Sequence, residues 1–334
     1  MRFCYLLRYA PTQTETFVYR EAQGLIDAGH RVRAVSWEAR EPGDELPDWE
    51  LRHPPGRAAL LPLVLRARGC WLAGHQRPKR VMQGLWFADQ LHPDEVVHAH
   101  FAGEAAEWAR QAWLERGIPY GLTVHAVDLF KPRPSLGALV RDARVLLTVT
   151  HHNAELLRQR FGVQAQVLPC GAPELPLSPL EGPVLSVARD VPKKGLDLLR
   201  RACATLGEPL RLVGAEGPRP SSEVREALAS SRLFALPCRE APDGDRDGLP
   251  VALMEAMAAG LPVITTTLPG LEELVDESVG WLVPPDDEQA LVEALREALA
   301  DPEEARARGL RGRARVQRDF SVRTQVQHFL AAWS

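Results

Sequence analysis

The chain has 334 residues, 45% of them hydrophobic, which is enough to fill a core in each of about two domains of roughly 150 residues. Its 40 basic residues stand against 44 acidic ones, so it lacks the cationic surplus of non-specific nucleic-acid binders, and we expect no nucleic-acid partner. No stretch approaches the ~18 uninterrupted apolar residues of a membrane span, and Arg8 interrupts the apolar start, so we expect a cytoplasmic protein without an export signal.

Short apolar runs alternate with helical patterns through the first half of the chain, as in the βαβ units of a parallel sheet. The pattern predicts a strand over Phe3–Leu7, a helix over Phe17–Ala28 and a strand over Val32–Trp37. Further strands are expected at Glu95–Ala99, Gly121–Val124, Val145–Val149 and Gln166–Leu168. We therefore expect a doubly wound α/β domain over residues 1–170.

A proline-rich segment follows, over residues 171–183. Proline has no amide donor and a fixed φ, so a segment with four prolines and two glycines suits a stiff connector between domains. We expect the domain boundary there.

The alternation restarts beyond this linker and predicts a second doubly wound domain over residues 184–318. Strands are expected at Val184–Ala188, Leu210–Val213, Leu233–Leu236 and Val263–Thr266, and helices near Lys194, Ser222, Pro250 and Asp287. In residues 319–334, apolar side chains fall on one helical face after a cap at Ser321, which predicts a closing amphipathic helix. Two open parallel sheets that face each other form a cleft, and ligands collect there at the carboxyl ends of the strands.

The five cysteines, Cys4, Cys70, Cys170, Cys203 and Cys238, are odd in number and include no Cys-x-x-Cys pair. We expect free thiols that are mostly buried.

The most informative segment joins the polar loop around Asp247 to an apolar helix. Pro250 suits the first turn of that helix, so the free amides of Gly248, Leu249 and Val251 would form an anion site. Asp247 and Glu255 would then hold sugar or ribose hydroxyls. In the alternative interpretation, Asp247 only caps the helix and Glu255 is a surface charge, although the apolar neighbours of Glu255 disfavour this.

Basic residues follow the first strand of the second domain. Arg189 and Lys194 would flank the cleft and neutralise a diphosphate leaving group without a metal. Alternatively, Lys193 and Lys194 are an exposed pair at a helix start, which is an unfavourable place for cations unless an anion binds.

In the first domain, His125 ends a predicted strand whose mouth faces the cleft, where its imidazole can donate to a substrate hydroxyl. Asp128 lies one turn further on. His98 and His100 are interpreted first as hydrogen-bonded core residues, and we expect no metal site because no carboxylate or cysteine has a suggestive spacing nearby.

Taken together, these residues resemble the retaining glycosyltransferases of family 4, which have the GT-B fold of two Rossmann-like domains. The resemblance spans nearly the whole chain and is closest to members that build exopolysaccharides such as colanic acid. Its landmarks are weak singly and specific together. They are Gly29-His-Arg-Val, Val97-His-Ala-His-Phe101, Thr123-Val-His125, Val187-Ala-Arg189, Lys193-Lys194-Gly195, Leu212-Val-Gly214, Asp247-x7-Glu255 and Pro269-Gly270-Leu-Glu-Glu273.

The resemblance implies a role for each matching residue. Arg189 and Lys194 would bind the diphosphate of a UDP-, GDP- or ADP-linked sugar, Glu255 the ribose and Asp247 the donor sugar, with His125 beside the reacting carbon. Gly214 and the amides of Gly248, Leu249 and Val251 would complete the donor site. The implied reaction retains the anomeric configuration and needs neither a metal nor a further cofactor.

The loop before the first helix resembles the Ser-Glu-Thr-Phe loop of exopolysaccharide-building members. This implies that Thr14, Glu15 and Thr16 lie on the acceptor side. The acceptor would be a glycan or a lipid-linked glycan, and the final helix would cross back to the first domain.

The sequence departs from the family pattern at three places. Asp247 replaces the usual Glu and shortens the reach by about one methylene, and Ala126 replaces the usual Gly. The segment from Gly214 to Leu233 is too short for the strand and helix that the family inserts there, and that strand commonly lines the nucleotide base.

A basic segment from Leu51 to Ala88 contains no acidic residue. Its seven cations are interleaved with leucines: Arg52, Arg57, Arg66, Arg68, Arg77, Lys79 and Arg80. A membrane-facing surface over Arg52–Arg80, which would make the protein peripheral to the inner face of the membrane, and a core helix whose arginines reach solvent fit this pattern equally well.

Two other functions are weighed against sugar transfer. A nucleotide-sugar 2-epimerase shares the architecture but is not marked by this Asp-x7-Glu and Arg-x4-Lys pattern. A non-catalytic GT-B-like binding subunit would follow if the shortened base region had lost its donor affinity. A dinucleotide oxidoreductase is disfavoured because no Gly-x-Gly-x-x-Gly follows the strands at Phe3 or Val184.

The shortened segment predicts weak base selectivity. We expect the second domain to bind a nucleoside diphosphate through Arg189 and Lys194 with similar affinity for UDP, GDP and ADP. Isothermal titration with the three nucleotides measures this, and a strong preference for one nucleoside would contradict the prediction.

Overall fold

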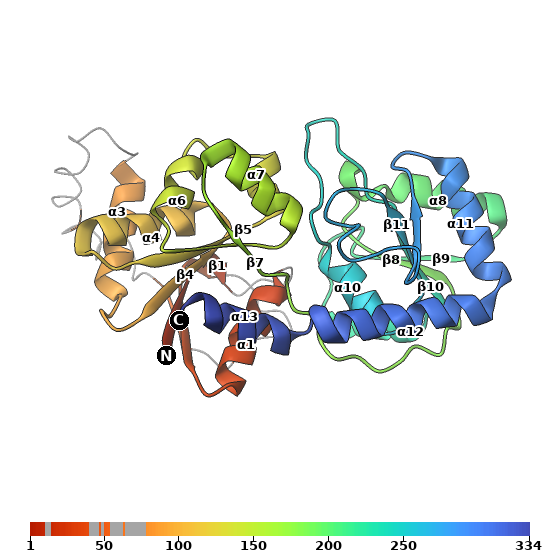
Figure 1. Ribbon diagram of the computed structural model, residues 1–334, viewed down its shortest axis with the longest axis horizontal. Coiled ribbons are helices and arrows are strands. Elements are labelled where there is room, and N and C mark those ends of the chain that lie inside the picture. Colours follow the sequence, from red (N-terminus) through yellow and green to blue (C-terminus); the bar gives the residue numbers. More distant parts are fainter. Residues whose placement is uncertain (11–14, 40–46, 48–49, 54–62, 64–77) are drawn as a thin grey trace.

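The structure is a computed structural model that describes residues 1–10, 15–39, 47, 50–53, 63 and 78–334. It has two lobes, each built on a parallel sheet covered by helices (Figure 1). This confirms the predicted α/β class with two Rossmann-like domains that face each other.

The first sheet has seven strands in the order β3-β2-β1-β4-β5-β6-β7, and every pair is parallel. The strands are β1 (Arg2–Ala10), β2 (Arg31–Ala39), β3 (Glu50–Arg52), β4 (Val96–His100), β5 (Tyr120–Val124), β6 (Val145–Thr148) and β7 (Gln166–Val167). The helices are α1 (Thr16–Asp27), α3 (Pro78–Gln90), α4 (Glu104–Arg116), α5 (Ala126–Phe130), α6 (Leu136–Asp142) and α7 (His151–Phe161). All strands predicted in this half are present. The sequence analysis missed β3, a short edge strand with no buried residue.

The second sheet has five parallel strands in the order β12-β11-β10-β8-β9. The strands are β8 (Val184–Val187), β9 (Leu210–Val213), β10 (Leu233–Leu236), β11 (Val263–Thr266) and β12 (Trp281–Val283). The helices are α8 (Leu196–Leu206), preceded by a 3₁₀ turn at Pro192–Lys194, then α9 (Ser221–Ala229), α10 (Val251–Ala258), α11 (Glu288–Ala300) and α12 (Pro302–Asp319). Because β8 lies between β9 and β10, the strand order reverses at β8, where open sheets bind ligands.

The second sheet lacks the strand that the family inserts after Gly214, as the sequence analysis expected. Residues 214–232 are all described, and they contain one helix, α9, and no strand. Strand β9 is therefore an edge strand.

Helix α12 was not predicted, because its sequence is polar and carries two glycines. Those glycines allow close packing: a β-carbon built on Gly309 would lie 2.3 Å from the carbonyl oxygen of Gly260. Such a contact is too short for any other residue at Gly309. The helix packs through a stripe of small and apolar residues, Ala305, Gly309, Gly312 and Val316, that allows close backbone approach.

The chain crosses between the domains twice, and the two crossings lie side by side. The amide of Ala172 donates to the carbonyl of Phe320 at 2.8 Å, and Ala172 forms a parallel bridge with Ser321. A β-carbon built on Gly171 would lie 2.6 Å from Cα of Val322, so only glycine fits at this point. The two crossings therefore act as one joint.

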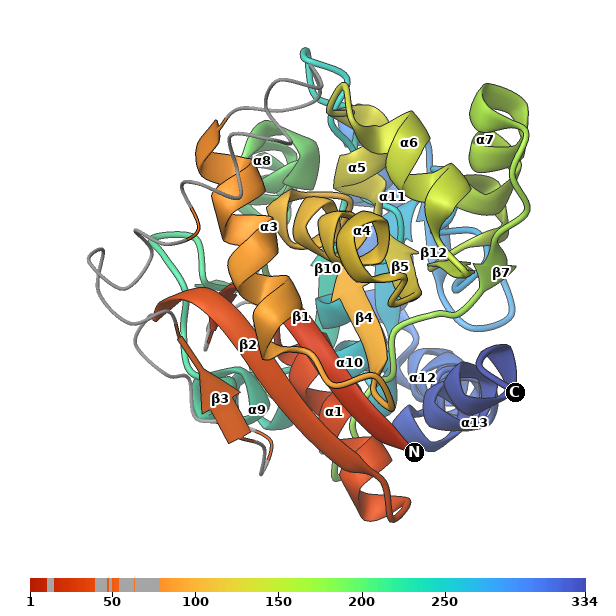
Figure 2. The same ribbon diagram turned by 90° about the vertical axis from the view of Figure 1, so that its left-hand side faces the viewer.

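The closing helix α13 (Val322–Ala332) packs on the first domain, beside α1 (Figures 1 and 2). Ser321 caps it by accepting from the amide of Thr324, as the sequence predicts. Phe329 is fully buried, and its ring lies 5.6 Å from that of Phe3 and 4.9 Å from that of His98. The predicted return of the chain to the first domain is confirmed.

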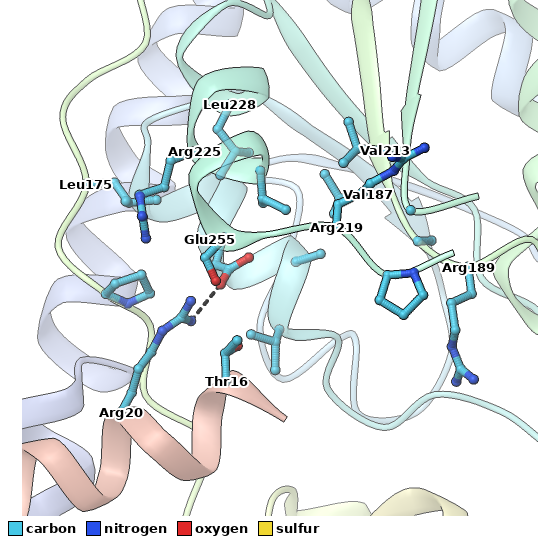
Figure 3. Close-up of a pocket in the computed structure, with 18 residues that line it drawn as sticks. Thr16, Arg20, Leu175, Val187, Arg189, Val213, Arg219, Arg225, Leu228 and Glu255 are labelled. Carbon is cyan, nitrogen blue, oxygen red and sulfur yellow. Dashed lines mark ion pairs between the residues drawn. The ribbon is translucent and has the colours of Figure 1, made fainter. Parts of the chain in front are cut away.

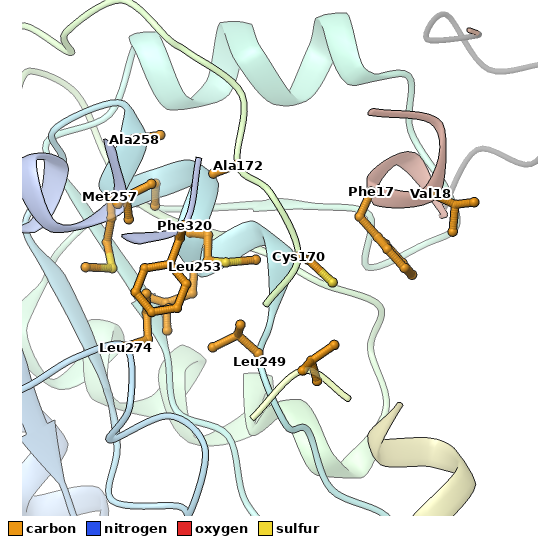
Figure 4. Packing of buried hydrophobic residues seen from close by; sticks show 14 of the residues in the cluster. Phe17, Val18, Cys170, Ala172, Leu249, Leu253, Met257, Ala258, Leu274 and Phe320 are labelled. Carbon is orange, nitrogen blue, oxygen red and sulfur yellow. The ribbon is translucent and has the colours of Figure 1, made fainter. Parts of the chain in front are cut away.

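A continuous apolar cluster joins the two domains (Figure 4). It brings Phe17 of α1 and Cys170, the last residue of the first domain, together with Leu249 and Leu253 at the start of α10. The beginning of α10 is therefore held against the first domain by burial of apolar surface.

Four cysteines, Cys4, Cys170, Cys203 and Cys238, are free and buried, as predicted, and Cys70 lies outside the described residues. Most of the basic segment also lies outside them, including Arg57, Arg66, Arg68 and Arg77. Arg52 is described and pairs with Glu50 at 2.6 Å. No helix among the described residues is long and apolar enough to cross a membrane.

The contacts of α13 generate a stability prediction. We expect Phe329→Ala to lower the free energy of unfolding by about 3–5 kcal/mol, because it empties a fully buried site between α13 and β1. His328→Ala, at an exposed neighbour, should change it by less than about 0.5 kcal/mol. Urea unfolding measures both, and equal effects would show that α13 does not pack as described.

Candidate functional site

A cavity of about 200 Å³ lies between the strand ends of the second sheet and helix α1 of the first domain. Arg189 follows β8, Gly214 follows β9, and Val251 and Glu255 lie on α10, so four predicted donor-site residues share this cavity (Figure 3). The first domain closes it from the other side with Thr16 and Arg20 of α1.

Glu255 is buried, with 8% of its surface exposed, and forms an ion pair across the domains. Its Oε1 lies 2.6 Å from Nη1 of Arg20, the pair drawn in Figure 3. The interpretation of Glu255 as a surface charge is therefore wrong. The sequence analysis missed Arg20, although it lies one helical turn after Thr16 and so on the same face of α1.

Three further arginines border the cavity. Arg189, Arg219 and Arg225 line it together with Arg20, against the single carboxylate of Glu255. This excess of guanidinium groups gives the cavity a positive potential that suits a polyanion such as a diphosphate. Arg219 and Arg225 flank the start of α9 and carried no motif by which the sequence could identify them.

Asp247 lies in a compact charged cluster before α10. Its Oδ2 is 2.5 Å from Nζ of Lys194, its Oδ1 is 3.3 Å from Nζ of Lys193, and the thiol of Cys238 lies 3.4 Å from Oδ2. Burial alone would raise the pKa of Asp247 and lower that of Lys194, but their mutual attraction outweighs it, so the Asp247 pKa is lowered and the Lys194 pKa raised. Burial, with the charge of Asp247, also raises the pKa of the Cys238 thiol well above its usual range.

The contacts of this cluster rule out two alternatives raised by the sequence, that the lysines are an exposed pair and that Asp247 caps α10. Lys193 and Lys194 are not an exposed pair, since only 11% and 15% of their side-chain surfaces are accessible. Asp247 does not cap α10, because the N-cap residue is Pro250 and it has no side-chain cap.

The other predicted donor-site residues at this helix lie outside the cavity. Leu249 is buried in the apolar cluster between the domains. Gly248 lies against the first domain, where a β-carbon built on it would be 3.2 Å from Cβ of Ala126. The loop that precedes α10 therefore contacts the residue that follows His125.

His125 ends β5 and is buried, with 8% exposure. Its ring lies 4.3 Å from that of Phe101 and 5.2 Å from that of Phe17. Burial, and then the neighbouring His100, lowers the pKa of His125 well below its usual value, so the imidazole is neutral at pH 7. Its backbone amide donates to the carboxylate of Asp128 at 2.9 Å. Burial raises the pKa of Asp128 to about 6 in spite of this hydrogen bond.

A second cavity, of about 450 Å³, opens at the strand ends of the first domain alone. Glu15 lines it, with Arg8, Tyr9 and Arg133. Thr16 lines the first cavity instead, and Thr14 lies outside the described residues. The structure thus divides the predicted acceptor-side residues between two cavities.

Polar contacts from the loop at 243–247 and from Glu273 hold the domains together beside these cavities. Lys131 of the first domain pairs with Asp243 at 2.6 Å and with Asp245 at 3.5 Å. Glu273, from the landmark after β11, accepts from the amides of His151 and His152 at the start of α7. A carboxylate at a helix start satisfies free amides and complements the helix dipole.

His98 and His100 are core residues, as interpreted from the sequence. Nε2 of His98 lies 2.8 Å from Oγ1 of Thr123, and Nε2 of His100 lies 3.1 Å from Oε1 of Glu21. The ligand atoms of these two histidines and Glu21 lie within 4.8 Å of one another, a grouping that sequence spacing could not reveal because Glu21 comes from α1. The expectation that no metal binds there stays a prediction.

Comparisons with known proteins agree on one family. Residues 14–173 match the family model described as Glycosyltransferase Family 4, and residues 183–301 match the model described as Glycosyl transferases group 1. The chain is 28% identical to the putative colanic acid biosynthesis glycosyltransferase WcaL of Salmonella typhimurium, over 96% of each protein. It is also 28% identical to the putative teichuronic acid biosynthesis glycosyltransferase TuaC of Bacillus subtilis, over 75% of this chain and 73% of TuaC.

Solved structures share the fold at low identity. Anabaena Alr3699/HepE in complex with UDP and glucose matches with a TM-score of 0.70 and 16% identity, covering 100% of this chain and 99% of that one. The sucrose-phosphate synthase of Thermosynechococcus elongatus matches with a TM-score of 0.71 and 18% identity, covering 100% and 98%. The chain is therefore a glycosyltransferase with the GT-B fold, built from a Glycosyltransferase Family 4 domain followed by a Glycosyl transferases group 1 domain.

Proposed function

We propose that this glycosyltransferase moves a sugar from a nucleotide-sugar to a glycan or lipid-linked acceptor in polysaccharide synthesis. The cavity lined by Arg189, Arg20 and Glu255 carries the proposal, because it combines cations for a diphosphate with a buried carboxylate for hydroxyl groups. The names of the relatives, which build colanic and teichuronic acids, support the polymer as the product class.

The donor would lie across the switch point of the second sheet. Arg189 and Lys194 would bind the diphosphate, and Gly214 and Val251 would border the nucleoside. Ribose hydroxyls would donate to Glu255, whose present partner is Arg20. A ribose hydroxyl that reaches Glu255 would compete with the guanidinium of Arg20. Binding of the nucleotide-sugar and contact between the domains would therefore depend on the same carboxylate.

The amides of Gly248 and Leu249 are proposed to bind a donor oxygen once the nucleotide enters. Asp247 would contact the donor sugar from beside Lys194. The ammonium of Lys194 would then lie near the bond that breaks and stabilise a departing diphosphate.

The proposed chemistry retains the anomeric configuration. The bond from the anomeric carbon to the diphosphate oxygen breaks, the acceptor oxygen bonds to the same face of that carbon, and the acceptor proton passes to the departing phosphate oxygen. The atoms balance without a protein base or a metal. His125 is neutral and would orient the sugar beside the reacting carbon.

The acceptor would occupy the second cavity, which Glu15 lines. Thr14 and Thr16 belong to the same proposal through the loop that precedes α1. For a lipid-linked acceptor, the basic segment over 52–80 would meet the negatively charged membrane surface, at the inner face.

Loss of the diphosphate contacts gives a direct test. We expect Arg189→Ala and Lys194→Ala each to weaken binding of UDP, GDP or ADP by about tenfold to hundredfold, since a hydrogen bond to a charged group contributes roughly 1.5–3 kcal/mol. Arg200→Ala, which removes an exposed guanidinium of α8, should leave it unchanged.

Isothermal titration measures these affinities. Thermal unfolding checks that the Lys194→Ala protein, in which Asp247 has lost this partner, still folds. Absence of heat with all three nucleotides in the wild type would contradict the donor site and favour a binding subunit without activity.

Stereochemistry and metal dependence give a second test. We expect an α-linked donor to give an α-linked product, read from the anomeric proton coupling in NMR, and the rate to change less than about twofold in EDTA, because Arg189 and Lys194 supply the positive charge. A β-linked product or a rate abolished by EDTA and restored by Mg²⁺ would contradict the mechanism.

A further inference from the structure

A line of buried polar side chains connects His125 to the closing helix. Nε2 of His125 lies 3.4 Å from Nδ1 of His100, and Nε2 of His100 lies 3.1 Å from Oε1 of Glu21. Gln325 of α13 donates from Nε2 to the other oxygen of Glu21, at 2.7 Å. The exposed fractions of these four residues are 8%, 4%, 0% and 5%, in that order.

Glu21 is surrounded by donors. Tyr5 donates its hydroxyl to Oε1 at 2.5 Å, and Gln325 occupies Oε2. The carbonyl oxygen of the Gln325 side chain accepts from the amide of Gly171 at 2.9 Å, so the line continues into the joint between the domains. A carboxylate that is fully buried needs such donors, because taking it out of water is otherwise costly.

With His100 as a neutral imidazole, these contacts determine where the protons lie. Both oxygens of Glu21 act as acceptors, so Nε2 of His100 carries the proton that it shares with Oε1. In a neutral imidazole the second nitrogen, Nδ1, then has a lone pair and can only accept. Its partner is Nε2 of His125, which must therefore donate, and this leaves Nδ1 of His125 as an acceptor.

We propose that Glu21 and His100 are positioning residues that hold His125 in one tautomer, protonated on Nε2, for sugar transfer. Phe17 and Phe101 pack against the ring, and the hydrogen bond to His100 fixes its rotation. The inference rests on the proposed function, which places His125 beside the donor sugar. Nδ1 of His125 is then a hydrogen-bond acceptor and takes no proton, whereas the sequence analysis expected the imidazole to donate.

The same atoms argue for a hydrogen-bond network in place of a metal site at Glu21, His98 and His100. The oxygens of Glu21 already receive three donors, and Nε2 of His98 is bonded to Thr123. A cation would have to displace these contacts.

The tautomer is measurable without any substrate. Long-range ¹H–¹⁵N spectra of protein labelled at histidine distinguish the two ring nitrogens, and His125→Ala assigns the signal. We expect His125 to be a single tautomer, protonated on Nε2, in the wild type. In His100→Phe, which keeps a ring stacked on Tyr5 but removes both nitrogens, we expect a mixture of the two tautomers.

His98→Phe is the matched control, because it removes a histidine of the same cluster that makes no hydrogen bond to His125 among the described contacts. It should leave the His125 spectrum unchanged. A wild-type ring protonated on Nδ1, or a single tautomer that survives in His100→Phe, would overturn the proposal. If His100→Phe does not fold, Glu21→Gln takes its place, since a carboxamide cannot accept from Tyr5, His100 and Gln325 together.

Turnover gives the second readout. The probes are UDP-glucose, UDP-galactose and GDP-mannose. We expect His100→Phe to lower kcat for nucleotide release by about tenfold to hundredfold and to leave KM unchanged. This is the range for outer residues that orient a functional group. His98→Phe should match the wild type, and an unchanged kcat in His100→Phe would refute the positioning role. If the wild type turns over none of the probes, the proposed function fails, while the tautomer spectra still report on the His100–His125 bond.

Discussion

The double crossing of the chain between the domains is the constraint on which the site depends. Parallel strands end at one edge of their sheet, so each domain has a single edge at which loops can collect functional groups. The hydrogen bond between Ala172 and Phe320 joins the two crossings, and the missing β-carbon of Gly171 lets them touch. Together with α13, this joint turns both edges toward one cleft, where α1 of the first domain meets α10 of the second.

Charge inside that cleft is balanced by pairs that a donor can rearrange. Arg20 and Glu255 meet across the domains, whereas Asp247 is neutralised by Lys193 and Lys194 within one domain. The cross-domain pair links α1 to α10 at the wall of the cavity, and in the proposed function a ribose would compete for the same carboxylate. The lysines, by contrast, pair with a carboxylate of their own domain. The family membership gives the class of reaction, and these contacts suggest how this chain carries it out.

Most elements with an apolar run were predictable, although the short strand β12 was missed. The strands β1, β4, β8 and β10 are buried on both faces and read as continuous hydrophobic runs. Strand β3 is an exposed edge, and α12 packs through Gly309 and Gly312, so neither leaves a hydrophobic pattern in the sequence. The expected absence of a strand after Gly214 was confirmed, because a count of residues suffices for that inference.

The sequence by itself determined the family, the two doubly wound halves and the identity of Arg189, Lys194, Asp247 and Glu255 as candidates, because these depend on local patterns and motif spacing. Only the tertiary structure decided which groups meet. Arg20 reaches Glu255, and Glu21 reaches His100 and Gln325, across separations of up to 304 residues. Such contacts depend on how helices from opposite ends of the chain pack on one sheet, and no local periodicity records that. The same packing buried the side chain of Leu249 in the apolar cluster between the domains, which the sequence did not indicate.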